Sequence, residues 1–489
     1  MNRSYQESRQ LPPFGLARER IIAAFPAPRG TVDMPVDDSV GRILAAPVHA
    51  GFAMPSTDVA EVDGIAVASR ETITAGADCP VVIETGARVN TGQPLPPGTD
   101  AVVPIECCAE GTTRLALEAP IDAGDGVRPS GSELEHGALL LPAGHRLRPI
   151  DVGPLVAAGV TYVQVRSVRV GVIPTGGELV LPGTMPGPGE SVASNPDAIR
   201  VLLAPHGAET TAHAVVPDDP EAVNAAIEAF RAKVDIVIVC GGSGRGTRDV
   251  VFSVVRSLGE IIVDGVAARP GRAFLMVRAG DLPVVALPGR PQPVGLLTEY
   301  FIVPLLAAWG LPAAAPPRVR VRLGLGIESH PRFAETVPLS VGRVGKNLIG
   351  IRQPRGRQGT RSQFRANARL RVPEAVAGYA PSDDVEVELL DDPDGPDMTV
   401  LVVGAVEEID LPGTGPRIAV VPCSQDEARA LLDRSSCHLA VLEGAPCAPC
   451  PSWPLRLESR GDVWFATPPR LVRDPKVREA LSALGITRC

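Results

Sequence analysis

The sequence predicts a multidomain protein of the α/β plus β class, and three observations lead to that prediction. First, 489 residues exceed what one hydrophobic core holds and suggest about three or four domains. Second, the chain has 50 Gly and 51 Pro but only 3% aromatic residues, so turns are frequent and small aliphatic side chains fill the cores. Third, a central region alternates strand patterns with helix patterns, whereas its flanks contain mainly short strand patterns.

Composition and charge exclude several classes of function. Hydrophobic residues make up 45% and charged residues 21% of the chain, as in ordinary folded proteins. The net charge of −9 argues against a nucleic-acid surface, although a local basic pocket could still bind a small anion. No apolar segment has the character of a secretory signal or the length of a membrane span. We therefore expect a cytoplasmic protein without nucleic-acid or membrane partners.

The region before the central one is expected to contain two parts. Residues 51–135 carry short alternating runs broken by Gly and Pro, such as AVVPIE and TRLALEA, which predict a small β domain. Residues 136–168 include the apolar stretch IDVGPLVAAGV, which predicts a linker that contains a helix.

The central region, residues 169–313, is expected to form an α/β domain with its ligand loops at the carboxyl ends of the strands. Strands are predicted within VRVGVIPTGGEL, AETTAHAVVPDD, VDIVIVCGG and LPVVALPGRP. Helices are predicted within NPDAIRVLLAPHGAE, DPEAVNAAIEAFRAK and TRDVVFSVVRSLG. The first of these helices should end at Gly207, and the second should begin through Asp219 and Pro220.

The C-terminal part is expected to contain a second β module and a small tail. Short strand patterns, RVRVRLGL and DVEVELL, follow Pro316 and Pro317, and the segment 351–371 between them is strongly basic. The sequence DDPDGPD then predicts a linker to a small separate domain.

Two glycine-rich loops follow neighbouring strands of the α/β domain. One is Thr175-Gly176-Gly177-Glu178, and the other runs from Gly241, Gly242 and Ser243 to Thr247. Small residues let backbone N–H groups approach an anion, which suggests a phosphate-bearing ligand. Ordinary turns also use glycine, so each loop taken alone is a weak signal.

Acidic residues accompany these loops. Glu178, Asp218 and Asp249, with Asp63 as a candidate from the first β domain, could hold Mg²⁺ on a phosphate or orient a water molecule. The alternative is structural: Asp218 or Asp219 could cap the following helix, and Asp249 could favour a helix start.

Arginines and cysteines supply two further candidates. Arg269 and Arg272 could bind a tetrahedral oxyanion, or they could lie in a solvated turn. Arg355, Arg357, Arg361 and Arg365 could likewise form a solvated face. Cys447 and Cys450, with Cys437 and His438 upstream, could hold zinc, but a second CxxC is missing and an irregular loop is the alternative.

Many short motifs, in this order, resemble those of the molybdopterin molybdenumtransferase family. The motifs of the first β domain are Pro55–Asp58, Val62–Ala66 and Asn90–Val103, followed by Val127–Leu134. Those of the α/β domain are Pro174–Leu179, Ser194-Asn195, Val216–Asp219, the 241–249 loop, Ala268–Ala273 and Leu287–Pro291. The collinear order of these motifs is far more specific than any one of them.

The resemblance implies a domain plan. Residues 1–50 and 136–168 would form a linker domain from separated segments, with residues 51–135 as an inserted β domain. Residues 169–313 would be the molybdopterin-binding α/β domain and 314–395 a β barrel. The tail, 396–489, resembles a shortened periplasmic-binding-protein-like domain. Family members are homodimers whose active site lies between protomers.

The resemblance also implies a reaction and its residues. Molybdate would be inserted into adenylylated molybdopterin with release of AMP and with Mg²⁺ assistance. Asp63, Glu178, Asp218 and Asp249 would be catalytic, and the last three would hold the metal. Arg269, Arg272 and Ser362 would bind molybdate. The substrate would contact Thr91, Thr175, Gly176, Gly241, Gly242, Ser243, Pro288 and Pro291.

The sequence departs from the family pattern at several loop positions. Gly177, Gly244 and Thr247 replace acidic or hydroxyl residues, Arg290 replaces a smaller residue, and Thr336 stands where an Arg is expected. An alternative is therefore a catalytically weakened homologue that binds pterin nucleotide or molybdate as a sensor or scaffold. The related adenylyltransferase reaction is a third hypothesis, and the surrounding β domains argue against it.

Overall fold

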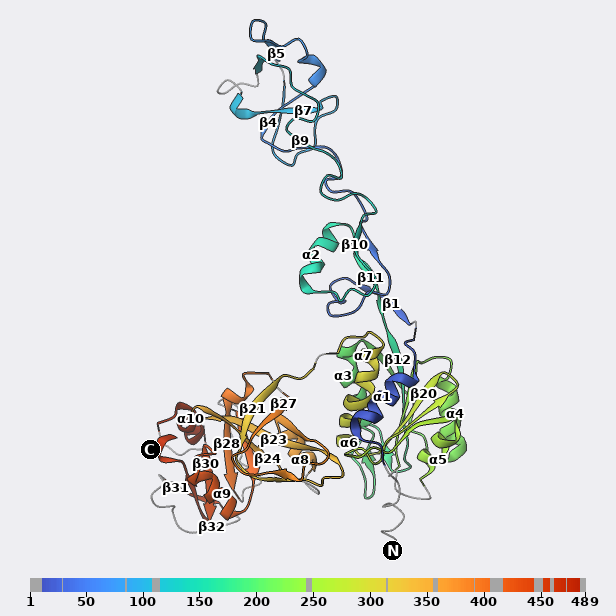
Figure 1. The fold of residues 1–489 in the computed structure, drawn as a ribbon, viewed down its shortest axis with the longest axis vertical. Helices are drawn as coiled ribbons and strands as arrows, with labels where there is room; N and C mark the ends of the chain where they lie inside the picture. Colours follow the sequence, from blue (N-terminus) through green and yellow to red (C-terminus); the bar gives the residue numbers. More distant parts are fainter. Residues whose placement is uncertain are drawn as a thin grey trace. The chain divides into compact units, whose positions relative to one another are not determined.

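The computed structural model divides the chain into two compact units, which are described separately (Figure 1). One unit contains the residues up to Pro28, Val168–Trp309 and the residues from Ala313 onward, and the other contains Arg29–Ser167 with Gly310–Pro312. The described residues are 11–28, 30–83, 86–107, 115–242, 249–313, 315–354, 359–390, 392–404, 417–443, 452–457, 461–471 and 473–483.

The unit around residues 29–167 contains a small linker domain. Antiparallel pairs join β1 (Thr31–Pro35) to β11 (Tyr162–Arg166) and β2 (Val48–His49) to β10 (Leu139–Leu141). Helix α2 (Pro149–Ala157) packs Leu155 into a core shared with residues of both chain segments. Two distant segments of the sequence therefore build one core.

The same unit contains the inserted β domain, which has a core of its own around Ile65 and Leu115. Its strands are β3 (Val59–Ala60), β4 (Gly64–Val67), β5 (Val81–Ile83), β6 (Ala87–Val89), β7 (Ala101–Pro104), β8 (Leu115–Leu117) and β9 (Val127–Arg128). They pair as β3–β9, β6–β4–β7 and β5–β8. A side chain at Gly64 would lie 2.0 Å from the Val103 carbonyl oxygen, so only glycine allows β4 and β7 to approach this closely.

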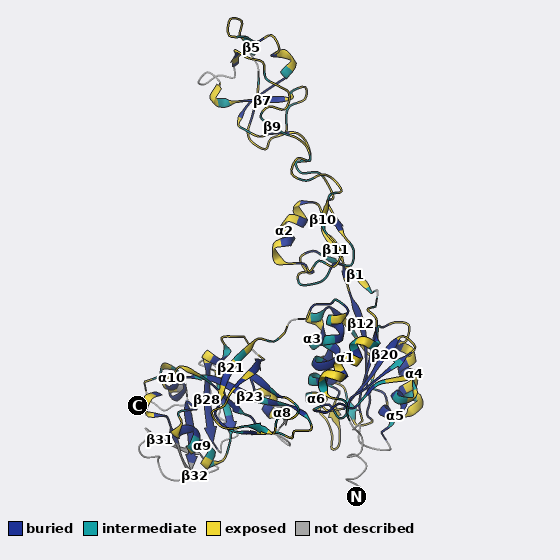
Figure 2. Ribbon diagram, viewed as in Figure 1, coloured by how far each residue is buried: buried dark blue, intermediate teal, exposed yellow. Residues whose placement is uncertain are grey.

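The α/β domain is built on a six-stranded sheet in the order β15–β12–β16–β20–β19–β17. The first four strands are parallel, β19 is antiparallel to β20, and β17 is antiparallel to β19. Their bounds are β12 (Val168–Pro174), β15 (Ala208–Ala212), β16 (Ile236–Cys240), β17 (Glu260–Asp264), β19 (Leu275–Ala279) and β20 (Leu282–Leu287). Strands β16 and β20 are buried throughout because helices cover both faces of the sheet (Figure 2).

Helices α4 (Pro220–Phe230) and α5 (Val250–Ser257) cover one face of this sheet (Figure 1). The other face carries α3 (Asn195–Leu203), α6 (Pro291–Leu297), η4 (Thr298–Ile302) and α7 (Val303–Ala308). As predicted, Gly207 ends the α3 segment in the left-handed conformation and Asp219 caps α4. The α/β domain is confirmed.

The N-terminal helix α1 (Phe14–Ala24) belongs to the α/β unit. The Trp309 indole donates to the Phe25 carbonyl at 3.0 Å, and Arg278 donates to the Ala24 carbonyl at 2.8 Å. The described part of residues 1–50 is therefore divided between both units, whereas all of it was expected in the linker domain.

The C-terminal β module is a closed five-stranded barrel, as the resemblance implied. The strands are β21 (Arg318–Leu323), β23 (Ala334–Val344), β24 (Asn347–Arg352), β25 (Ala368–Val372) and β27 (Asp384–Leu389). The ring closes in the order β23–β24–β21–β27–β25, with β25 paired back to β23. Strand β18 (Ala268–Arg269), from the α/β domain, pairs with β23, and helix α8 (Gly359–Arg365) follows β24. Strands β22 (Ile327–Glu328) and β26 (Gly378–Tyr379) pair beside the barrel.

The tail folds around a five-stranded sheet in the order β29–β28–β30–β32–β31. Its strands are β28 (Thr399–Gly404), β29 (Arg417–Pro422), β30 (Leu439–Glu443), β31 (Ser452–Leu457) and β32 (Gly461–Ala466), and its helices are α9 (Gln425–Asp433) and α10 (Pro475–Ala483). A single core joins Ile349 and Ile351 of the barrel to Leu401 and Leu431 of the tail. The expectation of a separately tethered domain is therefore wrong: the tail packs on the barrel as one body.

Among the described residues, no helix is both long and apolar enough to cross a membrane.

Candidate functional site

The candidate site lies where three parallel strands of the α/β sheet end side by side. Pro174, Cys240 and Leu287 are the last residues of β12, β16 and β20, and they are paired in register. The Thr175 N–H donates to the Cys240 carbonyl at 2.8 Å, and the Gly241 N–H donates to the Leu287 carbonyl at 3.0 Å. The predicted loops therefore meet at one edge of the sheet.

The glycines at this edge are required by close contacts. A Cβ at Gly241 would lie 1.8 Å from the Thr175 hydroxyl oxygen, and a Cβ at Gly242 would lie 2.2 Å from the Asp249 Oδ1. Gly242 has φ +74°, which also favours glycine. The structure thus brings together Thr175, Gly241 and Gly242 as expected; Ser243, Gly244 and Thr247 lie outside the described residues.

Asp219 and Asp249 are helix caps, which decides between alternatives that the sequence left open. Asp219 accepts from the Ala222 N–H at 2.9 Å and caps α4, so Asp218 is not the cap. Asp249 accepts from the Phe252 N–H at 3.3 Å and caps α5. Its carboxylate also faces Gly242, so capping and a role at the site are compatible.

Glu178, Asp218 and Asp249 interact electrostatically. Partial burial raises the pKa of Asp218, and the negative charges of Glu178 and Asp249 raise it further. The Glu178 carboxylate lies over Gly176, where an added Cβ would come 2.7 Å from its Oε2. Three carboxylates of like charge therefore interact at this edge of the sheet.

The third loop, Pro288 to Pro291, is tied to the first two. The Gly289 N–H donates to the Gly242 carbonyl at 3.3 Å, and the Asn195 side-chain amide donates to the Gly289 carbonyl at 2.9 Å. Pro291 is the first residue of α6 and Arg290 precedes it as the N-cap. Asn195 thus fixes this loop, a role that its place in the Ser194-Asn195 motif did not predict.

Arg269 and Arg272 lie at the junction of β18 with the barrel. Their guanidinium carbons are 4.7 Å and 5.6 Å from the centre of the Phe333 ring. Ser362 is buried on α8 and donates its hydroxyl to the Pro354 carbonyl at 2.5 Å. The structure therefore joins the two arginines, whereas the Ser362 hydroxyl is engaged with the backbone. Arg355 and Arg357 lie outside the described residues.

Asp63 and Thr91 belong to the inserted β domain, and the structure brings them together. Asp63 Oδ1 accepts from the Thr91 N–H at 2.7 Å and from the Thr91 hydroxyl at 2.9 Å. The backbone hydrogen bond from Thr91, followed by the hydroxyl bond, lowers the pKa of Asp63. Asp63 is therefore an ionised, oriented carboxylate on an exposed loop.

The zinc hypothesis for the tail finds no support in the described residues. His438 Nδ1 accepts from the Leu401 N–H at 3.0 Å, and its Nε2 lies 2.9 Å from the Arg343 carbonyl. Both ring nitrogens are therefore engaged with the backbone. Cys437 is buried, and Cys447 and Cys450 lie outside the described residues. No group of three or more His, Cys, Asp or Glu side chains in the described parts of the chain is arranged to hold a metal ion.

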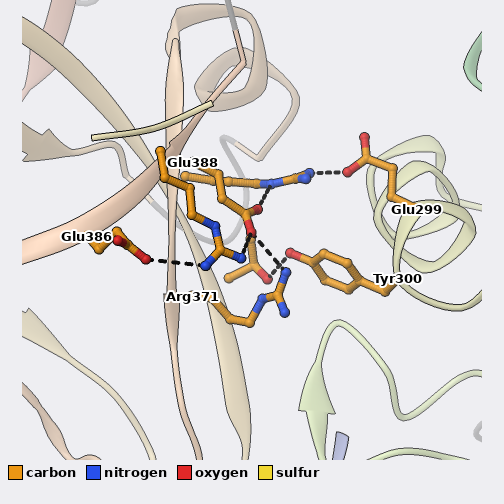
Figure 3. A network of polar contacts seen from close by, with 8 residues as sticks. Glu299, Tyr300, Arg371, Glu386 and Glu388 are labelled. Atoms are coloured by element: carbon orange, nitrogen blue, oxygen red, sulfur yellow. Dashed lines mark hydrogen bonds and ion pairs between the residues drawn. The ribbon is translucent and has the colours of Figure 1, made fainter. Parts of the chain in front are cut away.

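A buried ion cluster fixes the barrel against the α/β domain (Figure 3). Glu388 accepts from Arg369 at 2.8 Å, from Arg371 at 3.1 Å and from Arg318 at 3.4 Å. Arg369 also pairs with Glu299 of η4. The hydroxyls of Tyr300 and Thr336 are 2.6 Å apart, so Thr336 joins the same junction.

Family models match two parts of the chain. The MoeA N-terminal region (domains I and II) matches residues 13–159, and a probable molybdopterin-binding domain matches residues 171–308. The matched ranges contain Asp63 and Thr91 in the first case and the three strand-end loops in the second.

Relatives and a solved structure agree with these matches. The chain is 28% identical to molybdopterin molybdenumtransferase 2 of Mycobacterium tuberculosis, over 76% of this chain and 97% of the relative. It is 31% identical to the molybdopterin molybdenumtransferase of Synechococcus elongatus, over 56% of this chain and 74% of the relative. The molybdopterin biosynthesis MoeA protein of Pyrococcus horikoshii has a similar structure, with a TM-score of 0.60 and 28% identity over 78% of this chain and all of that one. The sequence motifs, the domain architecture and these matches together show that the chain belongs to the molybdopterin molybdenumtransferase family.

Proposed function

We propose that this protein is a transferase of molybdenum cofactor biosynthesis that inserts molybdate into adenylylated molybdopterin and releases AMP. Relatives that carry the name molybdopterin molybdenumtransferase support the activity class. The adenylylated form of the substrate and the roles of individual residues are part of the proposal.

The carboxylate group formed by Glu178, Asp218 and Asp249 is the single observation that carries the proposal. Burial raises the pKa of Asp218, and the negative charges of Glu178 and Asp249 raise it further, beside loops whose glycines leave no room for a side chain. A divalent cation relieves such repulsion, and hard oxygen donors suit Mg²⁺.

The three carboxylates fit a Mg²⁺ site that the protein builds only in part. Because no three described side chains form a ready-made metal cage, the ion would take the remaining ligands from water and substrate phosphates, as Mg²⁺ commonly does. Glu178, Asp218 and Asp249 would hold it, and it would neutralise phosphate charge when bound.

The other residues would bind and orient the two substrates. In this proposal Thr175, Gly176, Gly241, Gly242 and Ser243, with Pro288 and Pro291, surround the pterin phosphate and adenylate. Glycine at these positions lets a phosphate approach the backbone closely, because no Cβ lies in the way. Arg269 and Arg272 would bind molybdate through their forked N–H donors. Because Ser362 donates to Pro354, its oxygen could contact molybdate only as an acceptor from a protonated oxyanion.

Release of AMP is the direct test of this function. The purified protein is incubated with adenylylated molybdopterin, molybdate and Mg²⁺, and AMP is followed over time. Molybdate-dependent release is the expected result. Tight pterin binding without molybdate-dependent release would replace the proposal with the hypothesis of a sensor or scaffold.

We further propose a homodimer in which Asp63 and Thr91 come from one protomer and the carboxylate group comes from the other. Asp63→Asn and Asp249→Asn would each inactivate the enzyme. Mixing the two variants under conditions of subunit exchange should restore activity, because each mixed dimer would contain one intact site. If subunit exchange is demonstrated and the mixture still has no activity, Asp63 and Asp249 do not act in one site shared between protomers, and this proposal is wrong.

A further inference from the structure

The Phe333 ring contacts both arginines of the 268–273 loop. The guanidinium carbons of Arg269 and Arg272 lie 4.7 Å and 5.6 Å from its centre, within the range of cation–π attraction. The ring comes from the barrel, and the arginines come from the α/β domain. Residues about sixty positions apart in the sequence thus meet at one aromatic ring.

The backbone around Phe333 is fixed by hydrogen bonds. The Phe333 N–H donates to the His330 carbonyl at 3.0 Å, and the next N–H, of Ala334, donates to the Ala267 carbonyl at 2.9 Å. The β18–β23 pair then aligns Ala268 with Ala334. The His330 ring packs against Phe333 with its centre 5.4 Å away. The aromatic face is therefore held in register with the arginine loop.

Attraction of both guanidinium groups to the same ring limits the rotamers of both side chains. A cation–π contact uses the guanidinium group as a whole and does not require its N–H donors. Glu335, aligned with Arg269 in the strand pair, accepts from the Ser329 hydroxyl at 2.9 Å.

We propose that Phe333 is a positioning residue that holds Arg269 and Arg272 as a paired clamp for the molybdate oxyanion. This inference rests on the proposed function. Phe333 acts through the arginines and does not itself touch a reacting atom. Its loss should therefore weaken molybdate binding selectively.

The test compares three variants by steady-state kinetics. Phe333→Ala removes the ring, Phe333→Leu keeps apolar bulk without a π face, and Phe333→Tyr keeps the π face. We expect the first two to raise KM for molybdate by roughly tenfold, with KM for the pterin nucleotide and kcat nearly unchanged, because loss of two cation–π contacts is of that order. Phe333→Tyr should restore the wild-type KM for molybdate.

Calorimetric titration of wild-type and variant proteins with molybdate alone gives a second readout that does not need turnover. Weaker molybdate binding by Phe333→Leu than by Phe333→Tyr supports the inference. Equal binding by these two variants, or an equal loss in both KM values and kcat, overturns it by showing a purely structural role. If the wild-type protein releases no AMP but binds molybdate in a Phe333-dependent manner, the proposed function fails and the clamp stands. If the wild type shows neither response, both are overturned.

Discussion

Two charged clusters in the same unit differ in their electrostatic balance. Three guanidinium groups share the Glu388 carboxylate, and two of them also pair with the carboxylates of Glu299 and Glu386. The side chains of Arg369 and Glu388 are only 10% and 9% exposed. At the strand-end site, Glu178, Asp218 and Asp249 are three carboxylates of like charge, and the pKa of Asp218 is raised. The arginines of the first cluster are paired with carboxylates of the protein, whereas at the second site neighbouring carboxylates contribute to the raised pKa of Asp218.

This difference separates structure from function. Compensated buried charges fix one domain against another, and breaking them costs stability. Like charges held together by helix caps and glycine loops cost stability in the free protein, which is typical of sites arranged for a ligand. The comparison predicts that substitutions in the first cluster change folding and that substitutions in the second change turnover.

The largest expected effect is the loss of turnover in Asp249→Asn. Asparagine caps a helix about as well as aspartate, so α5 and the fold should be retained. The negative charge at the site is lost, and we expect AMP release to fall by about a hundredfold or more. Initial rates of AMP release, with circular dichroism to verify folding, provide the measurement.

Asp219→Asn is the matched control, because Asp219 caps α4 in the same way and is adjacent to Asp218. Its turnover should stay near that of the wild type. Equal turnover of Asp249→Asn and Asp219→Asn would remove Asp249 from the mechanism.

The next largest effect concerns stability. Glu388→Gln removes the carboxylate that three arginines share, and because Arg369 keeps its pair with Glu299 we expect a loss of up to about 3–5 kcal/mol, the cost of a fully broken buried pair. Urea unfolding measures the loss. Asp384→Asn, in the exposed pair with Arg322 on the same two strands, should cost less than about 1 kcal/mol. Similar losses in the two variants would contradict the distinction between the clusters.

A smaller effect is expected from His438, a buried polar group that is satisfied while neutral. Burial lowers the pKa of His438 to about 4, and the positive charge of Lys476 adds to this. The unfolded chain takes up the proton near pH 6.5, so the contribution of His438 is complete above that pH and is lost as pH falls from 6.5 to about 4. Unfolding of the wild type and His438→Gln across this range measures it, and identical pH dependence of the two proteins would refute the assignment.

The sequence predicted the α/β domain well because its signals are local. The buried strands are continuous apolar runs, and Asp219 with Pro220 marks a helix start within a few residues. The strand-end loops could therefore be placed at one edge before the structure was known, and Thr175, Gly241 and Gly242 do meet there.

Features that depend on distant segments could not be predicted. The antiparallel pairing of β17 with β19 could not be predicted, because neither strand carries a sequence pattern that specifies its partner. The shared core of tail and barrel could not be predicted either, because DDPDGPD resembles a linker. Ile351 of the barrel and Leu431 of the tail, for example, are buried in one core only because the two parts pack together in the tertiary structure. The meeting of Phe333 with Arg269 likewise depends on the β18–β23 pairing between domains.

The most direct test of the central claim is the pKa of Asp218, measured by carboxyl NMR in the wild type and in Glu178→Gln. If Glu178, Asp218 and Asp249 form one electrostatically coupled group, removing the charge of Glu178 lowers the pKa of Asp218 toward its ordinary value. The same pKa of Asp218 in both proteins would contradict the account, because the carboxylates would then be independent.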